Sequence, residues 1–505
     1  MKILMVTAEV SPLVKVGGLA DAVAGLAGAL SGDGHGVEWF LPGHRAVMAA
    51  LGDREGEGRP LALPMATADP VTLRSFGSPM GRLHVVDAPG LFDRPGVYTD
   101  PGTGAGYEDD AERFALFASA ACLYLRDGGS GAPDLVHCHD HPAALVPALL
   151  RHGPPALRAL RALPVVFTIH NLAHQGAAEP ALAARLGLDP ALIVPMGPLE
   201  YHGGLNPVKG AIELSDRVTT VSPTYASEIC SPGLGAGLEG VLQEHRARLR
   251  GILNGVDTTV WSPETDRLIV KNYGAGNLAG KAWNRRTLLQ RMSLEPAGAS
   301  TAVLGMISRL DEQKGIRLVL EVMDEMLAED VRLVVLGMGS PVLERALEEA
   351  AQRHPGRLAF RRDFSEELAH QIEAGSNIFL MPSLYEPCGL NQMYSLLYGT
   401  VPVVRATGGL ADTVFDPDEE PARGNGFVFR APLPVELLKT VRRALRAFRD
   451  RRRWRSLVGN GMAADYSWSR SAREYVEVYL AAIDDARRRA ADSEPAAGIN
   501  REVQQ

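Results

Sequence analysis

Short apolar runs alternate with segments of helical periodicity along most of the chain. A run of about four to eight apolar residues between turn residues is typical of a strand buried in a parallel sheet. Such runs predict strands over 2–7, 133–139, 163–169, 218–221, 302–307, 332–336, 378–381 and 401–404. Apolar residues at helical spacing predict helices over 18–30, 316–327, 391–398 and 467–489. Alternation of this kind predicts an α/β fold built on parallel sheets.

The length of the chain predicts more than one domain. A chain of 505 residues exceeds what one hydrophobic core usually serves, so two domains are expected. The strand-and-helix pattern starts again at 302–307, after the segment 251–257. The last predicted helix carries an apolar stripe, whereas residues 490–505 contain few large apolar side chains and are predicted to form a disordered tail.

The composition indicates an ordinary globular protein and narrows the classes of partner. Hydrophobic residues make up 46% of the chain and charged residues 22%, and the net charge is −8 at pH 7. A nucleic-acid partner is not favoured, because no basic stripe is available to neutralise phosphates. The arginine-rich segments 449–455 and 487–489 are interpreted as solvated helix faces.

Neither the opening residues nor the cysteines indicate an exported protein. The opening MKILMVTAEVSP reads as a strand and lacks the apolar core of a signal peptide. No run approaches the ~18 apolar residues that a membrane-spanning helix requires. Four scattered cysteines form no CxxC pair, so neither a zinc site nor a disulfide framework is indicated. These features predict a cytoplasmic protein without a membrane partner.

Residues that could bind a ligand or act in catalysis follow the predicted strands directly, at the carboxyl ends where parallel sheets bind ligands. The first strand leads to Lys15 and to Gly17 and Gly18, which open a helix and suit an anion. Later strands lead to Asp140, His170, Arg309 with Lys314, and Glu386. Two cations in one turn can converge on one anionic ligand. The pattern therefore predicts a cleft between two α/β domains that holds a phosphorylated ligand.

Two motifs that would indicate other chemistry are incomplete. The turn at 337–339 is not a dinucleotide fingerprint, because Val342 stands where the third glycine is required. The acidic stretch 416–420 resembles a metal-binding carboxylate pair but contains a proline and is interpreted as a solvated loop.

Five segments together resemble the family of bacterial glycogen synthases and plant starch synthases. They are KVGGLAD at 15–21, TIHNLAHQG at 168–176, DRVTTVSPTYASEI at 216–229, SRLDEQKG at 308–315 and EPCGLNQMYSLLYGTVPVVRATGGLADTV at 386–414. The resemblance runs from Lys2 to Tyr479. It implies two Rossmann-like, doubly wound domains facing across a cleft, the GT-B architecture. The acceptor-side domain would span 1–252 and the nucleotide-sugar-binding domain 253–465, and a helix over 466–489 would cross back and pack on the first domain.

The resemblance also implies a role for each candidate residue. Glu386, His170 and Asp140 would be catalytic. Donor binding would fall to Lys15, Gly17, Gly18, Asn254, Arg309, Lys314, Phe364, Cys388, Gly389, Leu390 and Asn391. The implied reaction is transfer of glucose from ADP-glucose to the nonreducing end of an α-1,4-glucan such as glycogen, with retention of configuration and without a cofactor or metal. Front-face displacement is implied, in which the leaving phosphate accepts the proton of the acceptor.

Two alternatives stay open. His141, Pro142, His174 and Pro207 depart from the family pattern, and all four lie in the first predicted domain. They allow the same chemistry with UDP-glucose as donor or with an acceptor other than glycogen. The second alternative is a glucan-binding protein without activity. The joint presence of all the charged and imidazole candidates argues against it.

Overall fold

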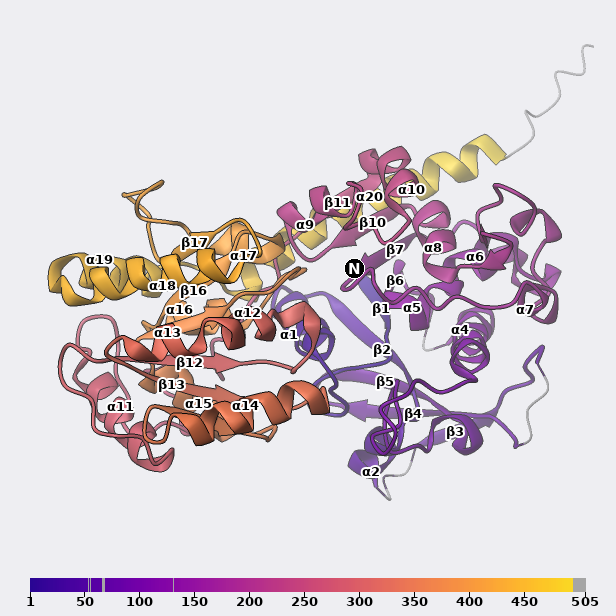
Figure 1. The fold of residues 1–505 in the computed structure, drawn as a ribbon. Helices are drawn as coiled ribbons and strands as arrows, with labels where there is room; N and C mark the ends of the chain where they lie inside the picture. Colours follow the sequence, from indigo (N-terminus) through magenta and orange to yellow (C-terminus); the bar gives the residue numbers. More distant parts are fainter. Residues whose placement is uncertain (53, 55, 66–68, 130, 494–505) are drawn as a thin grey trace, which may run out of the picture. The chain divides into compact units, whose positions relative to one another are not determined.

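The computed structural model describes residues 1–52, 54, 56–65, 69–129 and 131–493, and its elements are labelled in Figure 1. The chain divides into two compact units. Unit 1 comprises Met1–Val221, Ala226–Ile252 and the chain from Ser471 onward, and unit 2 comprises Ser222–Tyr225 and Leu253–Arg470. Each unit has its own, mainly parallel sheet with helices between its strands, which confirms the predicted α/β fold.

Unit 1 is built on a sheet in the order β11-β10-β7-β6-β1-β2-β5-β4-β3. All pairings are parallel except β3 with β4 and β4 with β5. The central strands β6 and β7 are buried along their whole length, as expected where helices cover both faces of a sheet. The strands are β1 (Lys2–Val6), β2 (Gly36–Pro42), β3 (Glu57–Pro60), β4 (Thr72–Ser78), β5 (Gly81–Asp87), β6 (Leu135–His139), β7 (Val165–Ile169), β10 (Arg217–Thr220) and β11 (Leu249–Gly251), beside a small hairpin of β8 (Glu200–Tyr201) and β9 (Gly204–Leu205).

The helices of unit 1 connect these strands. Pro207, one of the departures from the family pattern, is the first residue of α8, where its missing N–H is not needed, and Asn206 caps that helix. The helices are α1 (Gly18–Gly32), α2 (Arg45–Leu51), α3 (Pro89–Phe92), α4 (Asp110–Arg126), α5 (Asp140–Ala143), α6 (Leu145–His152), α7 (Ala181–Arg185), α8 (Pro207–Leu214) and α10 (Glu239–Glu244), and α9 (Pro223–Glu228) lies on the border of the two units.

Unit 2 contains an entirely parallel sheet in the order β14-β13-β12-β15-β16-β17. The strands that carry the predicted donor residues, β12 and β15, are neighbours, so the loops after them leave the same edge of the sheet. The strands are β12 (Ala302–Ile307), β13 (Val331–Leu336), β14 (Leu358–Arg361), β15 (Ile378–Met381), β16 (Val401–Arg405) and β17 (Phe427–Phe429). The helices are α11 (Ala279–Arg291), α12 (Ile316–Glu321), α13 (Met323–Ala328), α14 (Pro341–Arg353), α15 (Glu366–Gly375), α16 (Asn391–Leu397), α17 (Gly408–Thr413), α18 (Pro434–Arg449) and α19 (Arg451–Met462).

The helix predicted over 316–327 is two helices in the structure. Val322 leaves helical geometry with a φ of −111° and separates α12 from α13. Its side chain is buried in the core of unit 2, so packing rather than the apolar period decided where the helix breaks.

The last helix, α20 (Trp468–Ser493), extends beyond the predicted end. Its buried residues from Ala472 to Ala486 belong to unit 1, and Asp485 pairs with Arg217 at 2.7 Å. The prediction of a tail over 490–505 was wrong for residues 490–493, which continue the helix and include the two strong helix formers Ala490 and Ala491. The rest of that prediction, 494–505, lies outside the described residues. Among the described residues, no helix combines the length and apolar character needed to cross a membrane.

Candidate active site

The loop after β1 is fixed by a buried carboxylate. Glu9 accepts hydrogen bonds from the backbone N–H groups of Val16 and Gly17, at 2.6 and 3.1 Å, on its Oε2 atom. Tyr98 donates its hydroxyl to the other carboxylate oxygen at 2.8 Å. Burial raises the pKa of Glu9, and these hydrogen bonds oppose the rise. Glu9 and Tyr98 therefore set the shape of the loop that carries Lys15.

Lys15 lies on this loop with its ammonium 2.7 Å from Asp21 of α1. Both side chains are partly exposed, so the lysine stays accessible to a ligand. The two predicted glycines precede and begin α1, and a Cβ at Gly17 would meet no atom within 4 Å. The N–H of Gly17, which was expected to face an anion, is engaged by Glu9 instead.

Asp140 and His170 come together in unit 1 although 30 residues separate them. Asp140 follows β6 directly with a φ of 54°, and its Oδ1 accepts the backbone N–H of His170 at 2.7 Å. The pairing of β6 with β7 places the two residues at the same sheet edge. Burial raises the pKa of Asp140 to about 7, and the nearby Glu9 adds to the rise.

A row of histidines continues from His170 into the core of unit 1. The Nε2 atom of His170 lies 3.1 Å from Nδ1 of His139, and the His139 ring lies 4.0 Å from that of His137. His137 is fully buried and hydrogen-bonded through both ring nitrogens, to Tyr479 of α20 and to Thr168 of β7. Burial lowers the pKa of all three imidazoles, so they are neutral at pH 7.

This row and His44 make the stability of unit 1 sensitive to acid. His44, His137 and His139 are at most 2% exposed, and burial lowers the pKa of each. The unfolded chain takes up protons below pH ~6.5 while the native histidines stay neutral, because burial lowers the pKa of His44 and His137 to about 3 and also lowers the pKa of His139. Stability is therefore present above that pH and is lost as the pH falls toward the native pKa values. Each buried histidine contributes a slope of up to about 1.4 kcal/mol per pH unit. Asp140 and Glu9, whose pKa values are raised by burial, act in the opposite direction as the pH falls, but the three histidines outweigh them.

We expect the free energy of unfolding to be lower at pH 5.0 than at pH 7.5. Urea unfolding at the two pH values measures it. His139→Gln should make the loss on acidification smaller, whereas His202→Asn, an exposed residue with a positive φ that asparagine tolerates, should leave it unchanged. An equal loss in both variants and the parent would contradict a role for the buried row.

In unit 2 the predicted residue Glu386 is held by two partners. Its carboxylate is 5% exposed, and both of its oxygens accept hydrogen bonds from the Lys314 ammonium, at 2.9 and 2.7 Å. Ser383 donates its hydroxyl to Oε2 at 2.9 Å. The carboxylate is thus fixed and charge-compensated, which suits a group that accepts hydrogen bonds from a ligand and stabilises positive charge.

The loops after β12 and β15 meet beside the Lys314–Glu386 pair, and their close approach requires glycine at position 315. Gly315 has a φ of +67°, and a Cβ there would lie 2.1 Å from the carbonyl oxygen of Pro382. The close approach is reinforced by the backbone N–H of Leu384, which donates to the Gln313 carbonyl at 2.7 Å. These contacts join the turn after β12 to the loop after β15 and so bring Lys314 to Glu386.

The loop after Glu386 is held by hydrogen bonds from side chains of the protein itself. Gln392 donates its side-chain amide to the carbonyl oxygens of Cys388 and Gly389, both at 3.0 Å, just before α16 begins. Asn391 donates to the carbonyl of Ile307 at 2.8 Å, so this amide hydrogen, which was expected to reach a phosphate, stays within the protein. Burial raises the pKa of the Cys388 thiol to about 12, so Cys388 is neutral and no nucleophile.

Three further predicted donor residues are placed differently in unit 2. Arg309 follows β12, is largely exposed and lies 3.7 Å from Asp311. Phe364 is 75% exposed before α15, an unusual position for a large apolar ring. Asn254 is buried, and its Oδ1 has no hydrogen-bond partner among the described residues. A buried polar atom left without a partner indicates a place where a ligand or water completes the site.

The sequence did not point to Glu9, Tyr98 or Ser383. Glu9 follows a buried strand by three residues, so the rule that found Asp140 was available for it as well. Ser383 lies two residues beyond β15 and was within reach of the same rule. Tyr98 comes from a loop with no such signal, and only the tertiary structure places it. Among the described residues, no group of three or more His, Cys, Asp or Glu side chains is arranged to hold a metal ion.

Comparison with known proteins agrees with this architecture. The family model described as starch synthase catalytic domain matches residues 2–244, and the model described as glycosyl transferases group 1 matches residues 295–456. Glycogen synthase 1 of Methylococcus capsulatus is 44% identical over 96% of this chain and 97% of its own length. Glycogen synthase of an Anaeromyxobacter species is 44% identical over 95% and 99%.

Solved structures give the same result. The catalytic domain of starch synthase IV from Arabidopsis thaliana, bound to ADP and acarbose, matches with a TM-score of 0.85 and 34% identity over 96% of this chain and 99% of that one. Sucrose-phosphate synthase from Thermosynechococcus elongatus matches with a TM-score of 0.59 at 19% identity and shows the shared fold.

Two α/β units of this kind, with both matching family models, define a glycosyltransferase of the GT-B class. The similarity covers nearly the whole chain and the whole of its relatives. The chain belongs to the family of bacterial glycogen synthases and plant starch synthases, as its sequence motifs predicted.

Proposed function

We propose that the protein transfers glucose from ADP-glucose to the nonreducing end of an α-1,4-glucan, with retention of configuration and without a metal or other cofactor. The observation that carries the proposal is the buried Glu386 carboxylate, fixed by Lys314 and Ser383 beside the turn that also carries Arg309. The bound ADP of the Arabidopsis relative and the names of the bacterial relatives support the choice of donor and acceptor.

Within unit 2 we assign the diphosphate to Arg309 and Lys314. Cations placed there would stabilise the negative charge that develops on the leaving nucleoside diphosphate. The exposed ring of Phe364 suits stacking on the base, and the unpartnered Oδ1 of Asn254 suits a hydroxyl donor of the ligand. Glu386 would accept hydrogen bonds from the glucose hydroxyls and favour an oxocarbenium-like transition state.

Unit 1 would contribute Lys15, Asp140 and His170 to the same reaction. Asp140 uses Oδ1 for the His170 N–H, whereas its Oδ2 has no hydrogen-bond partner among the described residues, which suits a sugar hydroxyl. The neutral His170 can act as a hydrogen-bond donor or acceptor to the glucose. No nucleophile is assigned on this face, so we propose front-face displacement, in which the leaving phosphate accepts the proton of the acceptor hydroxyl.

The experiment measures release of nucleoside diphosphate from ADP-glucose and from UDP-glucose, with and without glycogen and with and without EDTA. We expect glycogen-dependent ADP release that EDTA does not reduce and that Asp140→Asn abolishes. Release from UDP-glucose alone would overturn the donor assignment and keep the reaction. Loss of activity in EDTA that Mg²⁺ restores would overturn the assignment of a metal-independent reaction.

One structural observation favours a second candidate, the same reaction with an acceptor other than glycogen. Two departures from the family pattern, His141 and His174, lie together in unit 1 with ring centroids 6.4 Å apart. His141 also contacts the ring of Tyr98, which orders the loop of Lys15 through Glu9. Donor hydrolysis that glycogen does not stimulate, but a shorter or different sugar acceptor does, would favour this candidate.

We also propose that the protein works in the cytoplasm. Cys122, Cys138, Cys230 and Cys388 are all free thiols, three of them buried, which is usual for proteins of a reducing compartment.

A further inference from the structure

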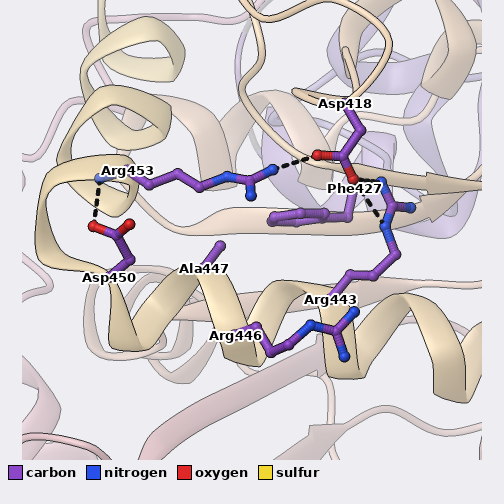
Figure 2. Close-up of a pocket in the computed structure, with 7 residues that line it drawn as sticks. All are labelled: Asp418, Phe427, Arg443, Arg446, Ala447, Asp450 and Arg453. Atoms are coloured by element: carbon purple, nitrogen blue, oxygen red, sulfur yellow. Dashed lines mark hydrogen bonds and ion pairs between the residues drawn. The ribbon is translucent and has the colours of Figure 1, made fainter.

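A pocket of about 220 Å³ lies in unit 2 away from the residues of the candidate active site. Edge strand β17 contributes Phe427, the helices α18 and α19 form two further sides, and Asp418 enters from the loop before β17, as Figure 2 shows. The volume is below the ~300–1,000 Å³ of sites for drug-sized ligands, so the pocket fits a small ligand or part of one. Its lining is Asp418, Phe427, Arg443, Arg446, Ala447, Asp450 and Arg453.

One carboxylate bridges two arginines of this pocket. Asp418 accepts hydrogen bonds from Arg443 at 2.6 Å and from Arg453 at 2.5 Å, so the guanidinium groups of α18 and α19 converge on it (Figure 2). The Asp418 side chain is 52% exposed and is therefore not locked in place by packing. The second carboxylate, Asp450, accepts the backbone N–H groups of residues 452 and 453 and serves as the cap of α19.

The third arginine of the pocket, Arg446, lies one turn after Arg443 on α18 and is exposed. Among the described residues it has no hydrogen bond and no ion pair. Every other charged side chain of the lining has an intramolecular partner. The same two helices carry further exposed arginines, of which Arg442 and Arg449 pair with Glu329, whereas Arg451, Arg452 and Arg455 have no ion pair among the described residues.

We propose that this pocket binds a small anion of the phosphate class, and that Asp418 is an internal substitute that the ligand displaces. Guanidinium groups offer paired donors that match the oxygens of phosphate, and three of them line one pocket. A phosphate carries more acceptor oxygens and more charge than a carboxylate, so it can engage Arg446 together with Arg443 and Arg453. Of the arginines in the segment 449–455, which was interpreted from the sequence as a solvated helix face, only Arg453 lines the pocket, and all of them are exposed.

The test is calorimetric titration of the full chain with inorganic phosphate, and separately with glucose 1-phosphate. Arg446→Gln should weaken binding about tenfold or more, because a charge-assisted hydrogen bond is lost without breaking any internal pair. Asp418→Asn should tighten binding, because the competing carboxylate is gone while its shape remains. Arg455→Gln, on α19 but outside the pocket, is the matched control. Arg309→Gln identifies any phosphate bound at the candidate active site, since it removes that component alone.

Opposite responses of the two pocket variants are the signature of the proposal. A weaker affinity in Asp418→Asn would overturn the proposal, and so would equal effects of Arg446→Gln and Arg455→Gln. The absence of measurable binding at phosphate concentrations up to about 10 mM would also overturn it, because only weak charge screening would then be left. Tighter binding of glucose 1-phosphate than of inorganic phosphate, lost in Arg446→Gln, identifies the ligand as a phosphomonoester. The reverse order identifies free phosphate. Thermal unfolding of each variant verifies that the fold is retained.

Discussion

Glu386→Gln should lower kcat by about 10³-fold, the upper range for removing one group that stabilises a transition state electrostatically. Glutamine keeps the shape of the side chain and can still accept the hydrogen bond from Ser383, but it removes the negative charge. The Lys314 ammonium then has no carboxylate beside it, and the positive charge that develops on the glucose is no longer compensated. Steady-state kinetics with ADP-glucose and glycogen measures the effect.

Glu344→Gln is the matched control for this variant. Glu344 is also a buried carboxylate of unit 2, 4% exposed, and it also pairs with a cation, Arg362 at 2.9 Å. We expect a comparable loss of stability in the two variants and near-normal turnover in Glu344→Gln alone. A kcat within about tenfold of the parent in Glu386→Gln would contradict an electrostatic role for Glu386 in the transition state.

Lys281→Met should destabilise unit 2 by about 1–3 kcal/mol, the range for leaving a buried hydrogen-bonding group without its partner. Lys281 is buried, and its ammonium donates to the carbonyls of Ala374 and Tyr398, at 3.1 and 2.9 Å, and to Thr400 at 2.6 Å. Burial lowers the pKa of Lys281 to about 7, and the nearby Glu373 opposes that fall. Methionine fills a similar volume but removes the donor to the Ala374 carbonyl and the Thr400 hydroxyl, whereas the Tyr398 carbonyl keeps its hydrogen bond from the Tyr273 hydroxyl.

Urea unfolding followed by tryptophan fluorescence measures the loss, because Trp261, Trp283 and Trp454 all belong to unit 2. Lys271→Met, an exposed lysine of the same unit, is the control and should change stability by less than about 0.5 kcal/mol. Equal stability of Lys281→Met and Lys271→Met would show that the network around Lys281 contributes nothing net.

The apolar runs predicted eight strands, four in each sheet, with small errors at their ends, but they missed β2, β3, β4, β5 and β11 in unit 1 and β14 and β17 in unit 2. The strands at 302–307 and 378–381 match the structure residue for residue, because short, continuous apolar runs have few other uses in a globular chain. The helix over 316–327 was predicted without its break, since burial of Val322 is a property of the packed core and not of the local sequence. The helical residues 490–493 were missed because the composition of this segment, which has few large apolar side chains, suggested a polar tail.

The candidate site was likewise predicted only in part. Position at the carboxyl end of a strand identified Asp140, His170, Arg309, Lys314 and Glu386, and family motifs supplied their proposed roles. Which of these groups touch was not predictable, because the contact of Lys314 with Glu386 depends on the close approach of two loops at Gly315. The same applies to Gly17 and Asn391, whose N–H groups were expected to face a ligand and are engaged by Glu9 and Ile307.

The sequence by itself determined the α/β class, the presence of two units, the family, and the set of side chains at the strand ends. These follow from local patterns, namely the apolar period, glycine turns and short motifs, which can be recognised in the sequence without knowledge of the fold. Only the tertiary structure decided that Glu9 and Tyr98 fix the loop of Lys15, that His137, His139 and His170 form one buried row, and that Arg443 and Arg453 converge on Asp418. Each of these arrangements joins segments distant in sequence, and their pKa values and charges depend on burial, which exists only once the chain has packed.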